Sequence, residues 1–429
     1  MSARYWIAAL LCGIASPALA QTVAITGGKL VIGDGSDPIE GGTVLVQDGK
    51  VIAAGRNVAV PAGVRTIDAK GKWVTPGLVV AVTDIGLYDV DGVDDSNDSE
   101  ARKSPFSAGL DLSYAINPDA QHIKVSRAGG VTRAAIAPLG TNAIFGGQGA
   151  VIDLGADPDP VMVARAFQYV ELGETGAARA GGSRVAAWAE LHDGLLEARE
   201  LSAAPAGARR DDVRLTRRDA QALVPVVTGR QPLYVHVERA ADIRMVLGLK
   251  KEFPLVRLVV VGATEGWMVA GELARAGVPV LATPMNDLPA RFEQLGATQS
   301  NVGRMKAGGV KVALGAFFDQ PRYAPQYAGN MVALARVPGA SGLTWNQAFV
   351  SISSGPAEAM GLGERIGSLR PGRAGDLVIW DGDPLELQTG VVSVFIDGVE
   401  QPLKDHQTRL RDRYRNSPTE GALPKAYDW

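Results

Sequence analysis

The feature that most constrains the fold is a long central stretch in which short apolar runs alternate with amphipathic helical segments. Segments with helical spacing, such as residues 240–253 and 267–276, follow several of these runs directly. Parallel strands that alternate with helices form either a (β/α)₈ barrel or a doubly wound sheet. The apolar runs that we expect to form strands are residues 131–137, 233–237, 258–261, 278–282 and 310–314.

The sequence favours the barrel over the doubly wound sheet. A dinucleotide-binding sheet needs Gly-x-Gly-x-x-Gly between a strand and a helix, and this sequence has no such motif in that place. Both ends of the chain have a different pattern, in which Asp48-Gly49 and Asp397-Gly398 are turn signals between apolar runs. We therefore predict an α/β fold, a (β/α)₈ TIM-like barrel with a small β-sandwich-like domain built from both chain ends. The predicted domains are residues 22–76 plus 365–403 for the composite β-domain, 77–364 for the barrel and 404–429 for a polar C-terminal arm.

The balance of charges argues against a nucleic-acid partner. Lys and Arg number 43 against 46 Asp and Glu, and the formal net charge is −3. Neutralising phosphates requires an excess of positive charge, which is missing here. We therefore expect a small-molecule ligand and no nucleic acid.

The first twenty residues have the pattern of a signal peptide. Arg4 provides a positive start, an apolar run covers residues 5–14, and Ala18-Leu19-Ala20 is an A-x-A cleavage signal. The single cysteine, Cys12, lies inside this segment, so the mature chain has neither a disulfide nor a zinc–thiolate site. No later stretch reaches about 18 apolar residues. We expect a periplasmic or secreted protein that has no contact with the membrane after cleavage.

Several stretches together resemble the amidohydrolase superfamily, and within it the imidazolonepropionase-like group. The first is Trp-Val-Thr-Pro-Gly-Leu at residues 73–78, which resembles the entry into the first barrel strand. The most specific is Ile-Gly-Ser-Leu-Arg-Pro-Gly-Arg-Ala-Gly-Asp-Leu-Val-Ile-Trp at residues 366–380, which resembles the return into the small β-domain. The other resembling segments are residues 116–118, 127–132, 146–152, 235–243 and 261–265. The resemblance implies hydrolysis of C–N bonds other than ordinary peptide bonds.

The resemblance also implies a divalent metal at the C-terminal mouth of the barrel, where it activates water and polarises the carbonyl under attack. The first strand of the family usually supplies His-x-His, and the matching positions here are Val82 and Asp84. The fifth strand keeps its histidine as His236, two residues before Glu238, whereas the histidine position of the sixth strand is Gly262. Valine and glycine cannot ligate a metal, so the family's metal site is degenerate in this sequence.

The candidate metal ligands that remain are His236, Asp84 and Glu238. On the eighth strand, the family's aspartate serves as ligand and proton shuttle. A direct match places Phe317 there, whereas a match on Asp-x-Pro selects Asp319 with two extra residues before it, and Asp319 is then the candidate catalytic residue. Gly147 and Gln148 are candidates for contacting a ligand at the mouth, although a tight turn made for packing explains the glycines equally well. The chain has only 4 histidines, too few at family positions for a His-rich dinuclear site.

Two functions remain open at this point. The leading interpretation is an exported amidohydrolase-fold protein that is inactive alone and serves as a ligand-binding protein or as a partner subunit, in a homo-oligomer or in a hetero-oligomer with an amidohydrolase. The alternative is an active hydrolase with a carboxylate-rich mononuclear metal site. We expect either no cofactor or a weakly bound divalent cation, with Mn²⁺ or Mg²⁺ favoured over Zn²⁺ because carboxylates suit hard cations.

The first prediction concerns export. Cleavage after Ala20 leaves a mature chain that begins at Gln21, because Ala18 and Ala20 are the small residues that the A-x-A signal requires. N-terminal sequencing of protein recovered from the periplasm or the medium measures this directly. Substituting Ala20→Arg should block processing, and exported protein that still begins at Met1 would contradict the prediction.

Overall fold

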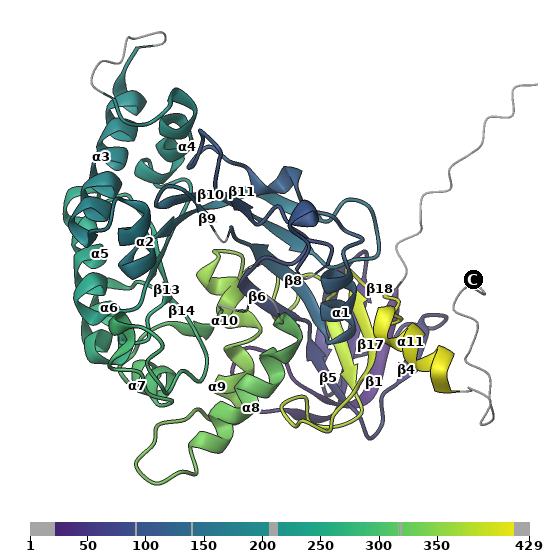
Figure 1. Ribbon diagram of the computed structural model, residues 1–429. Coiled ribbons are helices and arrows are strands. Elements are labelled where there is room, and N and C mark those ends of the chain that lie inside the picture. The colour runs from purple at the N-terminus through teal and green to yellow at the C-terminus, as the bar shows by residue number, and fades with distance from the viewer. Residues whose placement is uncertain are drawn as a thin grey trace, which may run out of the picture.

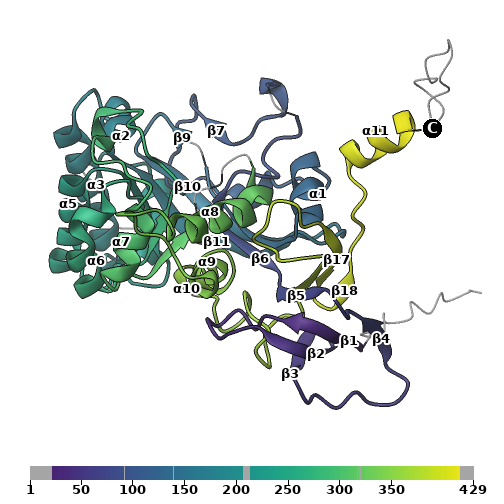
Figure 2. The same cartoon turned by 90° about the horizontal axis from the view of Figure 1, so that it is seen from below.

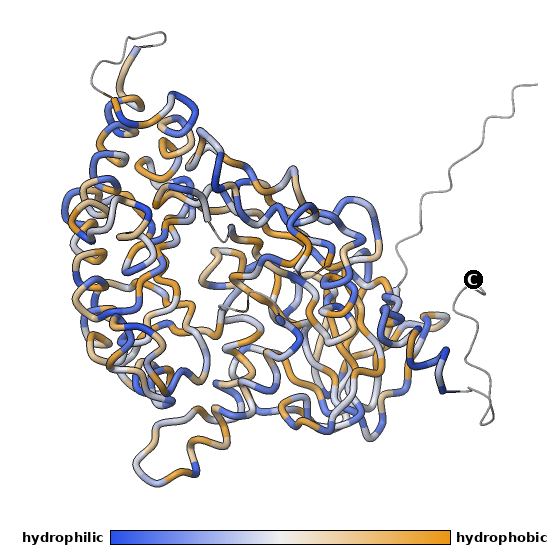
Figure 3. Tube along the Cα trace, viewed as in Figure 1, coloured by the Kyte–Doolittle hydropathy of each residue, from blue (hydrophilic) through white to orange (hydrophobic). Residues whose placement is uncertain are grey.

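The computed structural model describes residues 22–90, 92–138, 140–205, 213–315, 317 and 320–415. The predicted signal peptide at residues 1–20 and the candidate residue Asp319 lie outside the described residues. Of the predicted C-terminal arm, the structure describes residues 404–415, which include the helix α11 (His406–Arg415). This helix has no buried residue and is coloured hydrophilic in Figure 3.

The centre of the molecule is an eight-stranded barrel (Figure 1). The predicted (β/α)₈ TIM-like class is confirmed, and the five strands expected from apolar runs are all present. Two hydrogen bonds close the ring between its first and last strands, from Val82 N to Gly315 O at 2.8 Å and from Phe317 N to Val82 O at 2.9 Å. In hydrogen-bonding order the strands are β15 (Val312–Leu314), β14 (Val280–Ala282), β13 (Leu258–Gly262), β12 (Leu233–Val237), β11 (Val161–Glu171), β10 (Phe145–Asp153), β8 (Val131–Ile136) and β6 (Leu78–Thr83).

One barrel strand runs against the others. β10 is antiparallel to both of its neighbours, β8 and β11, whereas the remaining barrel pairs are parallel. The connections explain this direction. Only residues 137–144 join β8 to β10, and only residues 154–160 join β10 to β11. A parallel return needs a crossover of a dozen or more residues, so these short connections can produce only antiparallel neighbours.

The helices lie mainly around one side of the barrel and beneath it (Figures 1 and 2). The helix expected at residues 240–253 is confirmed to within one residue, whereas the one expected at 267–276 is divided into a 3₁₀ turn and a short α-helix. The α-helices other than α11 are α1 (Gln121–Ala128), α2 (Gly173–Arg179), α3 (Arg184–Ala203), α4 (Arg217–Val227), α5 (Ala240–Glu252), α6 (Ala270–Ala276), α7 (Asn301–Ala307), α8 (Ala324–Leu334), α9 (Trp345–Val350) and α10 (Ser354–Ala359). The 3₁₀ turns are η1 (Asp94–Ser96), η2 (Leu112–Tyr114), η3 (Gly266–Val269), η4 (Phe292–Gln294) and η5 (Pro321–Tyr323), and β7 (Glu100–Ala101) pairs with β9 (Gly140–Thr141). Among the described residues, no helix combines the length and apolarity needed to span a bilayer.

A second sheet lies at one end of the barrel and takes strands from both ends of the chain (Figure 2). The turn expected at Asp48-Gly49 is confirmed: it joins β2 to β3, and both residues have the positive φ that a tight hairpin of this type requires. The strands are β1 (Val23–Leu30), β2 (Ile39–Gln47), β3 (Lys50–Gly55), β4 (Arg65–Asp68), β5 (Trp73–Pro76), β16 (Leu377–Trp380), β17 (Val391–Ile396) and β18 (Val399–Glu400). The exact domain limits given above stay a prediction.

Separate apolar clusters fill the two bodies. Inside the barrel, aromatic and small side chains pack together, and the rings of Phe167 and Tyr234 stack with centroids 4.1 Å apart. The sheet domain has its own core, which includes Ile25, Val46 and Phe395. A further apolar cluster packs across the contact between the two bodies and includes Leu78 and Val131 of the barrel with Val378 and Trp380 of the sheet domain.

A buried arginine joins the two bodies. Arg133 lies near the start of β8 and is 1% exposed. Its guanidinium donates two hydrogen bonds to Asp376, which precedes β16 in the sheet domain, with Nε to Oδ2 at 2.6 Å and Nη2 to Oδ1 at 2.7 Å. Arg133 Nη2 also lies 2.8 Å from Asp397 Oδ1. Because both partners of the main pair are buried, removal of either one leaves an uncompensated charge in the interior.

We therefore predict that Arg133→Met destabilises the protein by about 3–5 kcal/mol, because Asp376 then remains buried without its partner. Urea or guanidinium denaturation followed by circular dichroism measures the change. The matched control is Arg65→Met, which breaks an exposed pair with Glu400 on the same sheet and should cost at most about 1 kcal/mol. An equal loss of unfolding free energy in the two variants would contradict the role assigned to Arg133.

Candidate functional site

Three polar side chains meet at the mouth of the barrel, where the parallel strands end. Glu171 is the last residue of β11, His236 lies near the end of β12, and Glu238 follows β12 directly. Glu171 and His236 are paired in register across the two strands. His236 Nδ1 lies 2.6 Å from Glu171 Oε1, and His236 Nε2 lies 3.2 Å from Glu238 Oε1. The imidazole therefore lies between two carboxylates.

Glu238 is fixed in place by the loop that follows β13. Its Oε2 accepts hydrogen bonds from Thr264 N at 2.8 Å and from Thr264 Oγ1 at 2.7 Å. Asn286, in the loop after β14, donates in turn from Nδ2 to Thr264 Oγ1 at 3.2 Å. Glu238 is only 5% exposed, and these donors satisfy the carboxylate oxygen that does not face the imidazole. The network connects three consecutive strands of the barrel.

The two carboxylates set the charge of His236. Burial by itself lowers its pKa, but Glu171 and Glu238 outweigh burial and raise the pKa of His236 well above its usual value. For Glu238, burial acts to raise the pKa, but the hydrogen bonds from His236 and Thr264 outweigh it and the net pKa is lowered. Both ring nitrogens of His236 face carboxylates, and these contacts favour the protonated form of the imidazole. An imidazolium has no lone pair for a metal.

The backbone conformation at position 262 and the side chains beside it disfavour a histidine there. Gly262 has φ +86°, a region that L side chains rarely adopt. A Cβ placed there would lie 2.8 Å from Glu238 Oε1 and 2.9 Å from His236 Nε2. A histidine at this position would therefore have to displace the carboxylate–imidazole cluster, so the glycine and the cluster are two parts of one arrangement.

The family resemblance assigns functional positions to the ends of the first and last barrel strands, and the structure describes Val82, Asp84 and Phe317 among them. Val82 is fully buried in the apolar cluster inside the barrel. Asp84 directly follows β6 and is 5% exposed. Phe317 is 5% exposed and packs against Tyr327 with ring centroids 5.7 Å apart. Since Asp319 lies outside the described residues, the choice between Phe317 and Asp319 as the family's aspartate position stays a prediction.

Gly147 and Gln148 lie away from His236. Gln148 pairs with Gln168, which pairs with Leu233 at the start of β12. Side chains opposite one another in a sheet share a face, and Gln168 alternates with Phe167, whose ring points into the barrel core. Gln148 therefore faces outward, level with the start of β12, and not toward the mouth where it was expected.

Sequence reasoning missed Glu171. The apolar runs that we expected to form strands do not include residues 161–171, because two exposed residues and a bulge interrupt their alternation. A signal was nevertheless present: Glu171 directly ends the run Ala-Phe-Gln-Tyr-Val and is followed by Leu172 and Gly173. An acid that ends an apolar strand of a barrel lies at the mouth, where functional side chains gather.

We tested whether these residues fit the divalent metal that the family implies, and they do not. The imidazole of His236 lies between two carboxylates, position 82 is apolar, and position 262 cannot accept a side chain without rearrangement. Within the described ranges, no group of three or more His, Cys, Asp or Glu side chains has an arrangement that could hold a metal ion.

Comparison with known proteins agrees with this fold. The Amidohydrolase family model matches residues 269–400. The amidohydrolase tasK of Hapsidospora irregularis is 26% identical over 414 residues, a match that covers 84% of this chain and 40% of tasK. The chain thus spans less than half the length of that relative. The imidazolonepropionase of Acidiphilium cryptum (strain JF-5) is 26% identical over 405 residues, covering 81% of this chain and 89% of that enzyme.

Among solved structures, the amidohydrolase from Thermotoga maritima MSB8 superposes with a TM-score of 0.77 at 25% identity. The match covers 88% of this chain and 99% of that one. Together with the barrel, the sheet domain and the mouth, these similarities define the class of protein. The chain belongs to the amidohydrolase superfamily.

The site generates a prediction about pH. A group whose pKa is raised by folding contributes its full stability below the unfolded pKa, which is about 6.5 for histidine, and loses it as the pH rises through the folded pKa. Glu171→Gln removes one of the partners that raise the pKa of His236. We expect this variant to be about 2 kcal/mol less stable than wild type at pH 6, with a difference that narrows as the pH approaches 10. Denaturant titrations from pH 6 to 10 measure both.

The chain offers a matched control for this experiment. Glu252 contacts His192 at 2.8 Å in a pair near the surface. Glu252→Gln should therefore change stability by less than about 1 kcal/mol at any pH in this range. If the difference in unfolding free energy between wild type and Glu171→Gln stays constant from pH 6 to 10, that result would contradict the ion pair at His236.

Proposed function

We propose that this protein is an exported member of the amidohydrolase superfamily whose C–N hydrolase site has been dismantled, and that it binds a small-molecule ligand at the barrel mouth without hydrolysing it alone. One observation carries the proposal: both ring nitrogens of His236 face carboxylates, at 2.6 Å from Glu171 and 3.2 Å from Glu238. The histidine that would ligate a metal is thus already used as the cation of an internal ion pair.

The contacts of His236 disfavour a resident metal. To bind either ring nitrogen of His236, a metal must separate that nitrogen from Glu171 or Glu238. Val82 and Gly262 offer no further ligand to compensate. Loss of even the groups around metal ligands costs about 10–100-fold in affinity or activity, and here ligand positions themselves are occupied by non-ligating residues. The proposal therefore includes no cofactor, or at most a weakly bound Mn²⁺ or Mg²⁺.

The chemistry of the mouth indicates the kind of ligand. Asp84, Glu171 and Glu238 are acidic, and Thr264 and Asn286 add neutral polar groups after the next two strands. Carboxylates accept hydrogen bonds, so a ligand with N–H groups or a positive charge suits this mouth. A second subunit, either another copy of this chain or an amidohydrolase, is the proposed partner, and the periplasm or the medium is the proposed location.

The rival function is an active hydrolase with a single metal held by Asp84, His236, Glu238 and Asp319. It has support from the relatives, since two of them carry the names of hydrolases. The rival requires His236 to lose its proton and to turn from an ion-pair donor into a metal ligand. Metal content and turnover therefore separate the two functions.

The experiment combines metal analysis with an activity screen. Purified mature protein is dialysed, analysed for bound zinc and manganese, and assayed with N-acyl amino acids, dipeptides and cyclic imides, with and without added Zn²⁺ or Mn²⁺. We expect zinc far below one atom per chain and no hydrolysis above background, because too few ligands remain to activate water. The same measurements are made on His236→Ala and Asp319→Asn.

His406→Ala is the matched control, because it removes an exposed histidine of α11 and leaves the barrel unchanged. Stoichiometric metal or clear turnover that is lost in His236→Ala but kept in His406→Ala would establish the rival function. Background rates in all four proteins, with no metal retained, support the dismantled site.

A further inference from the structure

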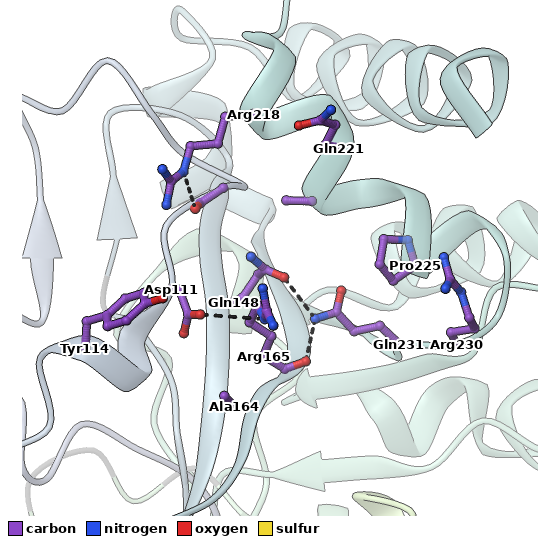
Figure 4. A pocket seen from close by; sticks show the side chains of 12 residues that line it. Asp111, Tyr114, Gln148, Ala164, Arg165, Arg218, Gln221, Pro225, Arg230 and Gln231 are labelled. Atoms are coloured by element: carbon purple, nitrogen blue, oxygen red, sulfur yellow. Dashed lines mark hydrogen bonds and ion pairs between the residues drawn. The ribbon is translucent and has the colours of Figure 1, made fainter. Parts of the chain in front are cut away.

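A second polar cavity lies on the outer side of the barrel, away from His236. It has a volume of about 560 Å³, in the range of small-molecule sites. Helix α4, the β10–β11 hairpin and the segment around η2 enclose it (Figure 4). We call it the α4 cavity, and its lining residues are Gly109, Asp111, Tyr114, Gln148, Ala164, Arg165, Arg218, Gln221, Ala222, Pro225, Arg230 and Gln231.

The charges around the α4 cavity are unbalanced. Three arginines line it, Arg165 from β11, Arg218 from α4 and Arg230 from the segment between α4 and β12. Among the lining residues of the described chain the only carboxylate is Asp111, whose Oδ2 lies 3.7 Å from Arg165 Nε and whose Oδ1 accepts two hydrogen bonds from Ser113. Three guanidinium groups against one carboxylate leave a positive cavity, and guanidinium groups bind carboxylates and phosphates by paired hydrogen bonds.

The backbone aims Arg165 at the cavity through a bulge. Gly149 pairs with Phe167 and Val151 pairs with Val163, so one residue of β10 lies opposite three residues of β11. Arg165 lies in the middle of these three and has φ +53°, which is uncommon for a residue other than glycine. Bulges often redirect a side chain beside a functional site, and such a conformation persists only where the surroundings stabilise it.

A buried amide supplies an acceptor that is not used. Gln231 is 5% exposed, and its Nε2 donates to Arg165 O at 2.7 Å and to Gln148 Oε1 at 3.3 Å. Its Oε1 is buried and has no hydrogen-bond partner among the described residues. Figure 4 shows this oxygen directed away from Gln148 and Arg165 and toward α4. A buried acceptor without a donor costs free energy, so a ligand that supplies an N–H or O–H group there is stabilised.

We propose that the α4 cavity binds a small organic anion, with a carboxylate or phosphate group for the arginines and an N–H or O–H group for Gln231 Oε1. This site is separate from the barrel mouth, and the proposal stands whether or not the mouth retains activity. Residues 218, 221, 222 and 225 are spaced so that one face of α4 covers the ligand. The exposed ring of Tyr114 forms part of the opposite rim.

The test measures binding to the purified mature protein by isothermal titration calorimetry at low ionic strength. The probes are N-acetylglutamate, glutarate and inorganic phosphate. We expect saturable binding of N-acetylglutamate at one site per chain, and weaker binding of glutarate, which lacks the N–H group for Gln231. Saturable binding of phosphate in preference to both carboxylates would assign the anion as a phosphate. Equal affinities for N-acetylglutamate and glutarate would overturn the role of Gln231.

Variants separate this cavity from general surface charge. Arg165→Gln and Arg218→Gln should each weaken binding about tenfold, the effect of one lost charge-assisted hydrogen bond. The matched control is Arg217→Gln, because Arg217 is the exposed neighbour of Arg218 on α4 and does not line the cavity. It should change affinity by no more than about twofold. Melting curves confirm that the variants are folded; absence of saturable binding by all three probes, or an equal loss in Arg217→Gln, would overturn the proposal.

Discussion

The buried ion pair between Arg133 and Asp376 is the contact on which the arrangement of the molecule depends. It joins the start of a barrel strand to a sheet whose strands come from residues separated by some three hundred positions in sequence. Apolar side chains also pack between the two bodies, among them Val131 of the barrel and Trp380 of the sheet domain. The bidentate guanidinium–carboxylate pair adds direction to this packing, because its two parallel hydrogen bonds form in only one geometry.

A second cluster of ionisable side chains lies at the barrel mouth, where His236 pairs with Glu171 and Glu238. Glu171 and Glu238 contact both ring nitrogens of His236, at 2.6 and 3.2 Å. Gly262 completes this arrangement, because any larger side chain would contact both Glu238 and His236. The result is a preformed cluster of two carboxylates around one imidazole at the barrel mouth.

Much of the fold could be predicted, because local patterns of apolar residues and turn residues determine where its strands and turns lie. The runs at 233–237 and 258–261 became β12 and β13 almost residue for residue, and Asp48-Gly49 formed the expected hairpin turn. The pair β10–β11 escaped prediction because a bulge breaks the alternation of β11 and because strand direction depends on connection length. The consequences reached the site: Glu171 was missed, and Gln148 was expected at the mouth although it faces the α4 cavity.

The sequence by itself determined which side chains stand at the family's ligand positions. Valine at position 82 and glycine at position 262 have no side-chain donor atom for a metal in any fold. Only the tertiary structure decided which groups surround these positions. Glu171 and His236 are 65 residues apart and meet because their strands pair in register, and the arginines of the α4 cavity come from a bulge, a helix and a loop. Long-range register and the cost of burying unpaired charge set these contacts, and neither can be seen in a local pattern.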